Sequence, residues 1–516
     1  MPLTGGWRVG TFFQREETCR YITELAACSR LVVYTGAGAT VDRTGVTWPG
    51  LVDELLKLGI DDPALRADLI RSQGAQRAAT IAYQIYKRRH GDLADDKLAE
   101  AISAVLYEGS GWVGGRLGEN LAKLAAAWIS KGSSIIVVSS NYDTYLELAL
   151  RRAQVRYDIR APEKNDIEKA FQPESEGRVQ LVYLHGRLPQ AGDESVSAID
   201  RKLVLSESSY YETATSTVPA LRSLFHDAHI LIAGGSLTDP PLLQALAETK
   251  DDKADVSAAR RYALLALQGS EWSTDPKILE HQVHHMSERL SHFGVKAIFP
   301  DFFCQVGQFF QEINTCAEPQ SDYGLPMSTT RYWSRLDNWW RTWLAERPDL
   351  IARQAQDHQT LHDGLLKVRQ ILGASDEEPL KAEVWIRWEP SERKLRLWAS
   401  SVGSWRDLHS MRDDLIHAES RYASVRGFCA GRPLLLSADD LCEKGDRWKR
   451  YLAVPIWRET GPTDSLIVGV ATIASMWDDY RGSILTENRA NIALAVPELG
   501  QIGQAILGAN SSASVG

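Results

Sequence analysis

The stretch Leu31-Val32-Val33-Tyr34-Thr35-Gly36-Ala37-Gly38-Ala39-Thr40 decides how this chain folds. Its first four residues suit a buried strand, its glycines suit a tight turn, and a helical pattern begins at Leu51. Because glycine has no Cβ, such a turn lets backbone N–H groups approach a phosphate closely. We therefore expect a strand, a turn and a helix that bind a phosphate-bearing ligand, with a dinucleotide as the first candidate.

The length and composition indicate a globular protein of several domains. The chain has 516 residues, which exceeds one ordinary core and predicts two or three domains. Its net charge of −9 gives no reason to expect a nucleic-acid surface. No apolar run approaches the roughly 18 residues of a membrane helix, and the first residues lack a signal-peptide pattern. The six cysteines are scattered without a C-x-x-C pair, so we expect a cytoplasmic protein without disulfides or a thiolate zinc site.

Unbroken apolar runs separated by helical patterns predict a parallel sheet. After the glycine turn the runs lie at 135–138, 181–184, 230–233, 262–265 and 295–299. Such runs are typical of strands that are buried on both faces, so the fold class is α/β, a Rossmann-like parallel sheet with helices on both faces. We assign residues 10–316 to this domain and interpret the polar helical pattern of residues 62–117 as an insertion.

Four segments with polar or glycine residues follow strands of this predicted sheet. They are Gly36–Thr40, Asn141–Asp143, His185 and Gly234–Asp239. In open parallel sheets, ligands bind at the carboxyl ends of the strands. We therefore expect these segments, which are far apart in the sequence, to meet in one crevice.

Each segment alone also has a plainer explanation. The turn lacks the third glycine of G-x-G-x-x-G, because Val41 stands there, and no acidic residue ends a second strand about 20 residues on, which disfavours a hydride-transferring dehydrogenase. No P-loop motif occurs either. The alternatives are a tight turn without a ligand, helix capping by Asn141 and Asp143, and a structural role for His185. The agreement of several strand ends favours a shared site.

Together, the segments resemble the sirtuin (SIR2) family in the family's own order. Gly36–Thr40 resembles its GAG-x-S signature, and Ser140–Asp143 resembles Q-N-I-D. His185-Gly186 resembles the catalytic H-G, and Gly234-Gly235-Ser236 resembles G-T-S. The resemblance covers about residues 10–315 and implies a SIR2 fold that binds NAD+.

The details resemble the bacterial SIR2-like effectors of antiphage defence, which deplete NAD and do not deacylate proteins. Pro49 follows Trp48, and Ser236 is followed by Leu-Thr-Asp. The four-cysteine zinc module of the deacylases is missing, because residues 186–233 contain no cysteine. The G-I-P-D-F-R run is replaced by Gly45-Val46-Thr47-Trp48-Pro49-Gly50. Both departures remove parts associated with acyl-lysine chemistry and leave the NAD parts.

The residues suit the cleavage of NAD+. Nicotinamide is a cationic leaving group on an anomeric carbon, so the protein must hold the ribose, stabilise charge and offer a nucleophile. Asn141 can bind a ribose hydroxyl or orient water, His185 can accept a proton, and Asp143 can orient either partner. The expected NAD+-binding residues are Gly36, Ala37, Gly38, Thr40, Trp48, Gly234, Gly235, Ser236 and Asp239. We expect no metal, because the pair His281 and His285 has no third ligand in view.

The composition changes after Cys316. Residues 317–330 read as a linker, and eleven of the sixteen tryptophans lie beyond Cys316. We assign residues 331–374 to connecting helices and residues 375–508 to an α+β domain with an antiparallel sheet, which loosely resembles GAF sensor domains. That resemblance implies a small-molecule or nucleotide activator and dimerisation. The alternative is that the aromatic residues form an ordinary core and contact surface.

These observations lead to the hypothesis of an NAD+ glycohydrolase that releases nicotinamide and ADP-ribose, or a cyclised form. We expect an abortive-infection effector against phage, restrained by its second half or by assembly until a signal arrives. The expected partners are further copies of the chain and a partner protein of a defence operon, without a membrane. The alternatives are a zinc-free deacylase or ADP-ribosyltransferase with a peptide groove beside Trp48, and a non-catalytic sensor of NAD or ADP-ribose.

Overall fold

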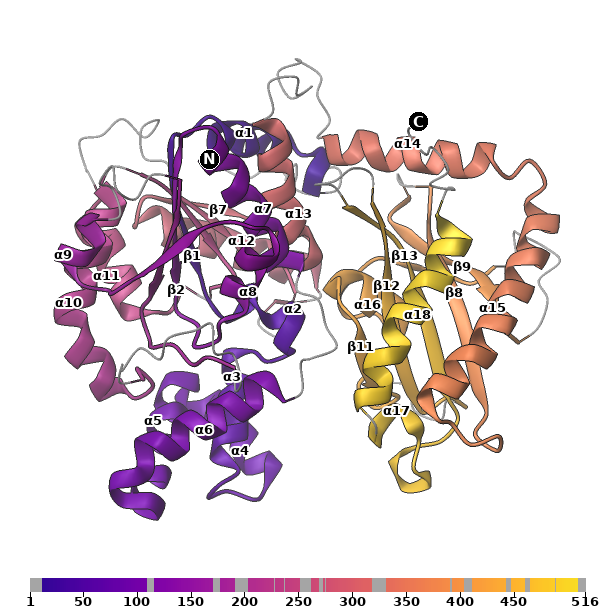
Figure 1. Cartoon of the computed structure of the whole chain (residues 1–516), viewed down its shortest axis with the longest axis horizontal. Helices are drawn as coiled ribbons and strands as arrows, with labels where there is room; N and C mark the ends of the chain where they lie inside the picture. The colour runs from indigo at the N-terminus through magenta and orange to yellow at the C-terminus, as the bar shows by residue number, and fades with distance from the viewer. Residues whose placement is uncertain are drawn as a thin grey trace.

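The structure of the chain, a computed structural model, consists of two halves that lie side by side (Figure 1). The described residues are 12–108, 116–169, 177–190, 203–226, 228–235, 237–250, 261–268, 272–273, 275–317, 331–389, 392–402, 411–441, 447–459, 465–487 and 489–508. The parallel-sheet half extends to residue 317, and the C-terminal half begins at residue 331. Apart from its first residue, the predicted linker lies outside the described residues.

The first half is built on a seven-stranded sheet with the order β3-β4-β2-β1-β5-β6-β7. Its strands are β1 (Arg30–Thr35), β2 (Ser134–Ser139), β3 (Tyr157–Arg160), β4 (Val179–Tyr183), β5 (His229–Ala233), β6 (Arg261–Leu264) and β7 (Val295–Ile298). All neighbouring strands in it are parallel. The predicted Rossmann-like sheet is therefore confirmed, although the sequence patterns do not predict the short strand β3.

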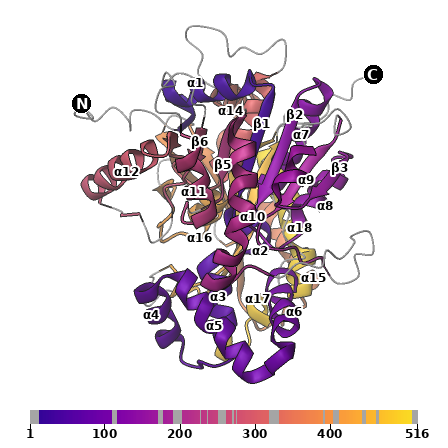
Figure 2. The same ribbon diagram turned by 90° about the vertical axis from the view of Figure 1, so that its left-hand side faces the viewer.

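The side chains of β1 alternate between two apolar layers, as expected for a strand that is buried on both faces. Leu31 and Val33 belong to one hydrophobic cluster, and Val32 and Tyr34 belong to the other. The first face is covered by α1 (Glu16–Ala26), α7 (Arg116–Ser130), α8 (Tyr145–Arg152) and α13 (Cys304–Cys316). The second face is covered by α9 (Lys164–Glu168), α10 (Glu207–His226), α11 (Pro240–Glu248) and α12 (Pro276–Ser291). Figure 2 views this second face, with α10 crossing in front of the strands.

A helical lobe follows β1 and lies at the bottom of Figure 1. Its helices are the short α2 (Val41–Thr44), α3 (Trp48–Leu56), α4 (Pro63–Gln73), α5 (Ala75–His90) and α6 (Ala94–Tyr107). Thr47 and Asp62 cap α3 and α4 with their side chains, as their sequence positions favour. Tyr142 and Tyr145, which follow β2, pack into the core of the lobe. The lobe therefore borders the carboxyl ends of the central strands.

The C-terminal half contains a six-stranded sheet with the order β10-β9-β8-β13-β12-β11. Its strands are β8 (Leu380–Trp388), β9 (Lys394–Ser400), β10 (Asp413–Leu415), β11 (Leu434–Ser437), β12 (Arg450–Glu459) and β13 (Ser465–Ser475). All neighbouring strands are antiparallel. One face packs against α15 (Leu350–Leu372) and α18 (Arg489–Leu507), and the other packs against α16 (Ala423–Ala430). The predicted α+β architecture is therefore confirmed, whereas the likeness to GAF domains stays a prediction.

The two halves share one continuous hydrophobic core. A single cluster contains Phe309 and Phe310 of α13 together with Trp343 of α14 (Arg331–Ala345) and Val384 of β8. The ring of Trp343 stacks on that of Trp340, with centroids 5.4 Å apart, and is fully buried. The tryptophans of α14 therefore serve as core, as the plainer sequence interpretation holds.

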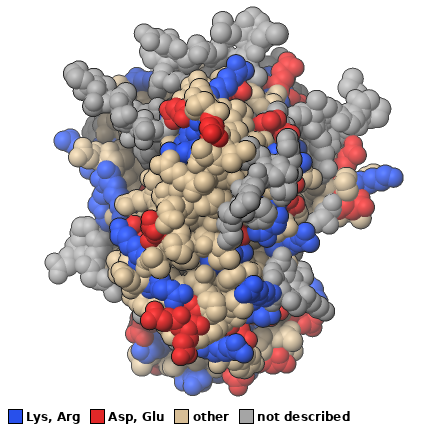
Figure 3. Space-filling view, turned by 90° about the vertical axis from the view of Figure 1, so that its right-hand side faces the viewer, with Lys and Arg blue, Asp and Glu red and all other residues tan. Residues whose placement is uncertain are grey.

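The face on the right-hand side of Figure 1 carries an uncharged central area with acidic and basic side chains interspersed around it (Figure 3). Neither sign of charge dominates on this face. Within the described ranges, no helix combines the length and the apolar character that crossing a bilayer requires.

Candidate active site

The glycine turn after β1 packs directly against the turn after β5. The Gly38 N–H donates to the Gly234 carbonyl oxygen at 2.8 Å. A Cβ on Gly38 would lie 2.6 Å from the Gly234 Cα, and a Cβ on Gly36 would lie 2.8 Å from the Gly235 Cα. Gly234 itself has a φ of +71°. These glycines are therefore required for the close approach of two backbones, in addition to the predicted contact with pyrophosphate.

Several N–H groups of this turn already have partners in the chain. The Ala39 N–H donates to the Gly36 carbonyl oxygen at 2.8 Å, and the Thr40 N–H donates to that of Ala37 at 3.3 Å. The turn forms a short 3₁₀ segment, Ala37–Ala39. Its role as a pyrophosphate site stays a prediction, and these particular N–H groups are occupied as the chain stands.

Asn141, Thr40 and Asp143 form one buried hydrogen-bonded chain. The Asn141 amide donates to the Thr40 hydroxyl at 3.1 Å, and that hydroxyl donates to the Asp143 carboxylate at 2.9 Å. The second Asp143 oxygen accepts from the Tyr145 N–H at 3.1 Å, at the start of α8. Burial raises the pKa of Asp143 to about 6, although the bonds from Thr40 and Tyr145 oppose the shift. Asp143 thus combines the predicted capping role with a place beside Asn141.

His185 follows β4 and lies next to the segment that contains Asn141. Its Nδ1 is 3.1 Å from the Ser140 carbonyl oxygen, and its ring meets the Tyr210 ring edge-on at 4.9 Å. Its Nε2 faces Asp239 Oδ1 at 3.6 Å. The Tyr34 hydroxyl donates to the other Asp239 oxygen. The structure therefore brings His185 together with Asp239, whereas Asp143 binds Thr40 instead.

A buried ion pair joins the His185 loop to α8. Arg187 donates to both carboxylate oxygens of Glu147, at 2.7 and 2.8 Å, and both side chains are almost fully buried. Tyr183 of β4 donates to the same carboxylate at 2.8 Å. The Leu188 N–H also donates to the Tyr142 carbonyl oxygen at 2.7 Å. These bonds thus hold the segments that carry Asn141 and His185 in fixed positions relative to each other.

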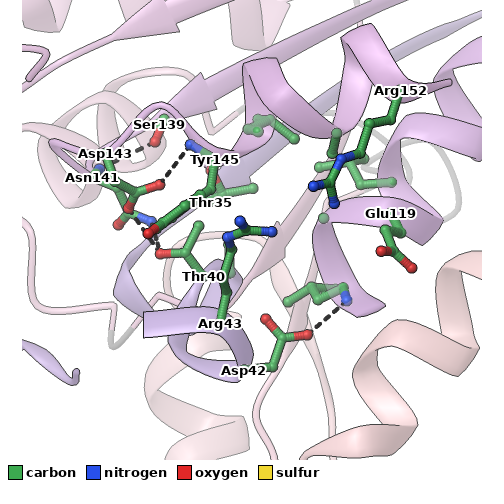
Figure 4. A pocket seen from close by; sticks show the side chains of 16 residues that line it. Thr35, Thr40, Asp42, Arg43, Glu119, Ser139, Asn141, Asp143, Tyr145 and Arg152 are labelled. Atoms are coloured by element: carbon green, nitrogen blue, oxygen red, sulfur yellow. Dashed lines mark hydrogen bonds between the residues drawn. The ribbon is translucent and has the colours of Figure 1, made fainter. Parts of the chain in front are cut away.

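A pocket enclosing about 560 Å³, part of it open to solvent, lies beside Asn141 and Asp143. Figure 4 shows these two residues on one side, Arg152 and Glu119 on the other, and Arg43 between them. The Arg43 guanidinium lies 4.2 Å from the centre of the Tyr145 ring. His185 and Asp239 are not among the lining residues. The pocket therefore extends from Asn141 on the side of α2, α7 and α8.

Other predicted residues have less direct places. Trp48 packs against the core of the helical lobe and does not line the pocket. Gly235 lies beside the Tyr34 ring, with its Cβ position 3.8 Å away. Ser236 lies outside the described residues. The sequence analysis assigned no role to Tyr34, Tyr210 or Arg43, and the signal for Tyr34 was its place at the end of β1.

A metal site has no candidate in the parts of the chain that the structure describes, where three or more suitable side chains do not gather. Of the predicted pair His281 and His285, His285 lies near the Glu288 carboxylate at 3.7 Å, and the adjacent His284 lies 3.2 Å from the same carboxylate. These are exposed ion pairs on α12, which are usually weak.

Comparison with known families adds an independent observation. Residues 135–287 match the family model of the SIR2-like domain. The matched range contains Asn141, His185 and Asp239, whereas the glycine turn lies before it. No curated protein matches the chain. The SIR2-like domain and the seven-stranded parallel sheet together support the SIR2-like fold, which points to a function related to NAD.

Proposed function

We propose that the SIR2-like domain is an NAD+ glycohydrolase, which cleaves the bond between nicotinamide and ribose. The observation that carries the proposal is the meeting of His185 with the Ser140–Asn141 segment at the carboxyl ends of β2 and β4. His185 Nε2 and Asp239 Oδ1 are buried, and neither has a hydrogen-bond partner among the described residues. Buried polar atoms of this kind are suited to the hydroxyl groups of a ribose or to an attacking water.

The reaction requires few protein groups. Water supplies the oxygen that bonds to the ribose carbon, nicotinamide leaves with the bonding electron pair, and the proton of the water needs an acceptor. His185 Nε2 is the acceptor in this proposal, and Asn141 orients the water or a ribose hydroxyl. The NAD+-binding residues predicted from the sequence keep their roles in this proposal. The exceptions are the backbone N–H groups that already donate to other atoms of the chain.

The pocket beside Asn141 suits the leaving nicotinamide. Thr40, Asn141 and Asp143 supply a hydrogen-bonding wall for a carboxamide, and Leu146 and Ala149 supply apolar surface. Arg43 adds a positive charge near this wall. A neighbouring positive charge such as that of Arg43 destabilises the pyridinium cation of bound NAD+ relative to free, neutral nicotinamide. It would therefore favour the departure of nicotinamide.

We further propose that the enzyme acts as an abortive-infection effector against phage in the cytoplasm. The resemblance of the Asn-Tyr-Asp and Gly-Gly-Ser-Leu-Thr-Asp segments to antiphage SIR2-like effectors supports this role. Its control would come from a signal, a small-molecule or nucleotide activator at the C-terminal half, assembly of several copies, or a partner protein. The shared core of the two halves gives the C-terminal half a physical route to the site.

The test is to incubate the full chain with NAD+ alone, with candidate activators, and with an acylated peptide, while nicotinamide release is followed. Release without peptide supports hydrolysis, and release only with peptide supports a deacylase. NAD+ binding without product under every condition supports a sensor. Either of the last two results would overturn the proposal.

We expect Asn141→Ala and His185→Ala each to lower the rate of nicotinamide release by at least about 100-fold, because each removes a group that acts on the reacting atoms. His281→Ala and Asn338→Ala are the matched controls, because both side chains are exposed and remote from the site. Thermal unfolding verifies that all four variants remain folded. A normal rate in either site variant would contradict the assigned roles.

A further inference from the structure

Asp239 stands where an aspartate normally caps a helix, yet its side chain does not do so. It is the N-cap residue of α11, and it makes no side-chain hydrogen bond to the backbone of that helix. The next two residues are Pro240 and Pro241, which have no N–H to offer. By contrast, Asp275 caps α12 with bonds to the N–H groups of Lys277 and Ile278. Capping therefore does not explain the direction of the Asp239 side chain.

The loop before Asp239 is fixed in an uncommon conformation. Leu237 has a φ of +54° although it is not glycine, and its side chain is buried. Arg289 of α12 donates to the Leu237 carbonyl oxygen at 3.1 Å. Leucine rarely adopts a left-handed conformation, so the surrounding packing must hold it. Asp239, two residues further on, faces the sheet and not its own helix.

The hydrogen bonds around His185 determine which of its nitrogen atoms is the base. A carbonyl oxygen can only accept, so the contact with Ser140 requires a proton on Nδ1. In neutral His185, Nε2 then carries a lone pair, and it faces Asp239 Oδ1 at 3.6 Å. Two acceptors that face each other are stabilised when a proton is placed on the nitrogen. The contact thus favours a proton on Nε2.

Tyr34 determines the state of the other Asp239 oxygen. Burial and the Asp239 carboxylate hold the pKa of Tyr34 well above its usual value. The phenol therefore keeps its proton and donates it to Asp239. That bond stabilises the carboxylate form and fixes which oxygen faces His185. Tyr34 lies on β1, the central strand of the sheet, so this support is held on both sides by neighbouring strands.

We propose that Asp239, held by Tyr34, is a positioning residue that stabilises the protonated imidazole of His185 after Nε2 has accepted a proton. This inference rests on the proposed hydrolysis of NAD+, and it replaces the contact with NAD+ that the sequence analysis assigned to Asp239. In the step, the O–H bond of water or of a ribose hydroxyl breaks and an Nε2–H bond forms. The oxygen keeps the electron pair of its broken O–H bond, and no oxidant or reductant takes part.

The groups that face His185 come from several elements. Tyr34 lies on β1, Asp239 lies before α11, and Tyr210 of α10 contacts the ring from its edge. Tyr142 lies close enough to Asp239 for the carboxylate to raise the pKa of its phenol further, beyond the larger effect of burial. The pKa values of all three phenols are raised, chiefly by burial, so these phenols stay neutral near pH 7 and Asp239 is the acidic group that acts on Nε2.

The test compares Asp239→Asn with the wild-type full chain in NAD+ turnover across pH. Asparagine keeps the size and removes the charge, so we expect kcat to fall by about 10- to 100-fold. NAD+ affinity should stay unchanged. The acid limb of the pH–rate profile should move to lower pH, because the protonated imidazole loses its anionic partner. Tyr34→Phe should reduce kcat by a smaller factor.

The matched control is Asp275→Asn, an N-cap aspartate that also precedes a proline but does cap its helix. We expect it to leave the kinetics and the pH profile unchanged. The proposal is wrong if Asp239→Asn behaves like this control. It is also wrong if KM rises at constant kcat, because that result would restore the direct contact with NAD+.

A second readout does not depend on turnover. In protein labelled with ¹⁵N-histidine, the ring signals of His185, assigned through His185→Gln, report when the imidazole becomes protonated. We expect protonation to begin at a lower pH in Asp239→Asn than in the wild type. Identical titration curves would overturn the proposal that Asp239 stabilises the protonated imidazole. If the wild type releases no nicotinamide, the proposed function fails. The titration still tests whether Asp239 stabilises the protonated imidazole of His185.

Discussion

At the scale of single residues, Asp42 carries a carboxylate in an unfavourable place. It lines the pocket directly after the glycine turn, and one of its oxygens accepts from the Leu117 N–H at 2.8 Å. The other oxygen is buried and has no hydrogen-bond partner among the described residues. Burial raises the pKa of Asp42 to about 7, and Glu119 raises it further, whereas the Leu117 bond and the charge of Arg432 oppose the shift.

Asp42→Asn should therefore stabilise the protein at alkaline pH. The folded-state pKa of about 7 lies above the unfolded value of 3.8, so the stability linked to this group is present below pH 3.8 and lost as pH rises through 7. We expect the variant to raise the free energy of unfolding at pH 8 by up to about 4 kcal/mol, and at pH 5 by less than half of that amount. Denaturant titration measures this, with exposed Asp68→Asn as control. An equal effect at both pH values would refute the assignment.

Single residues also show which parts of the site could be predicted from the sequence and which could not. Asn141 and His185 could be found because both directly follow apolar runs, and parallel strands bring such positions to one edge. The role of Asp239 could not be found, because an aspartate before proline reads equally well as a helix cap. Only the rotation of its side chain toward Tyr34 and His185 distinguishes the two roles, and no sequence pattern encodes that rotation.

At the scale of elements, the contact between the turns after β1 and β5 limits what can replace Gly234. An alanine there would adopt a φ of +71° and would place its Cβ 2.4 Å from the Ala39 nitrogen. Gly132 has the same φ of +71°, but its Cβ position meets nothing within 4 Å. The two glycines thus separate the backbone cost of an alanine from the cost of the collision.

We expect Gly234→Ala to lower the free energy of unfolding by about 3 kcal/mol or more, because the strain of the left-handed backbone adds to a backbone collision. Gly132→Ala should cost only about 1 kcal/mol, from the strain alone. Chemical denaturation of both variants gives the comparison. Equal losses in the two variants would mean that the turns separate easily, contrary to the packing described above.

The elements that the sequence predicted well are those with clear boundaries. Helix α15 begins after Asp349, which caps it, and ends at Gly373, which adopts the left-handed conformation. Helix α13 was not predicted: it is buried on nearly all sides, and Gln305, Gln308 and Gln311 lie beside its apolar residues Val306, Phe309, Phe310 and Ile313. Each glutamine bonds to a specific backbone group, which only the folded neighbours supply. The helical periodicity of apolar residues identifies helices that have one solvent-exposed face, and α13 has no such face.

At the scale of the whole molecule, α13 joins the two halves. The Gln308 amide donates to the Ser465 carbonyl oxygen at the start of β13, at 2.9 Å. Glu312 is fully buried and accepts from both the Tyr332 N–H and the Arg335 guanidinium of α14. Beside the pocket, Arg432 reaches the lobe, with a guanidinium nitrogen 3.2 Å from the Cβ position of Gly45. A tethered sensor would not make such contacts, so we expect the halves to unfold together.

The pair formed by Arg335 and Glu312 provides a test of this joint unfolding. Arg335→Met leaves the Glu312 charge buried without its guanidinium, which should cost about 3 kcal/mol. Arg341→Met is the matched control on the same helix, because Arg341 pairs with Asp337 while 77% of its side chain is exposed, and its loss should cost less than about 1 kcal/mol.

Calorimetry should show one transition that moves to lower temperature in Arg335→Met. Two separate transitions in the wild type, with only the C-terminal one affected by Arg335→Met, would mean that the halves are independent. A single shifted transition would instead mean that the C-terminal sheet, α13 and the layer of helices that backs the proposed NAD+ site form one cooperative unit.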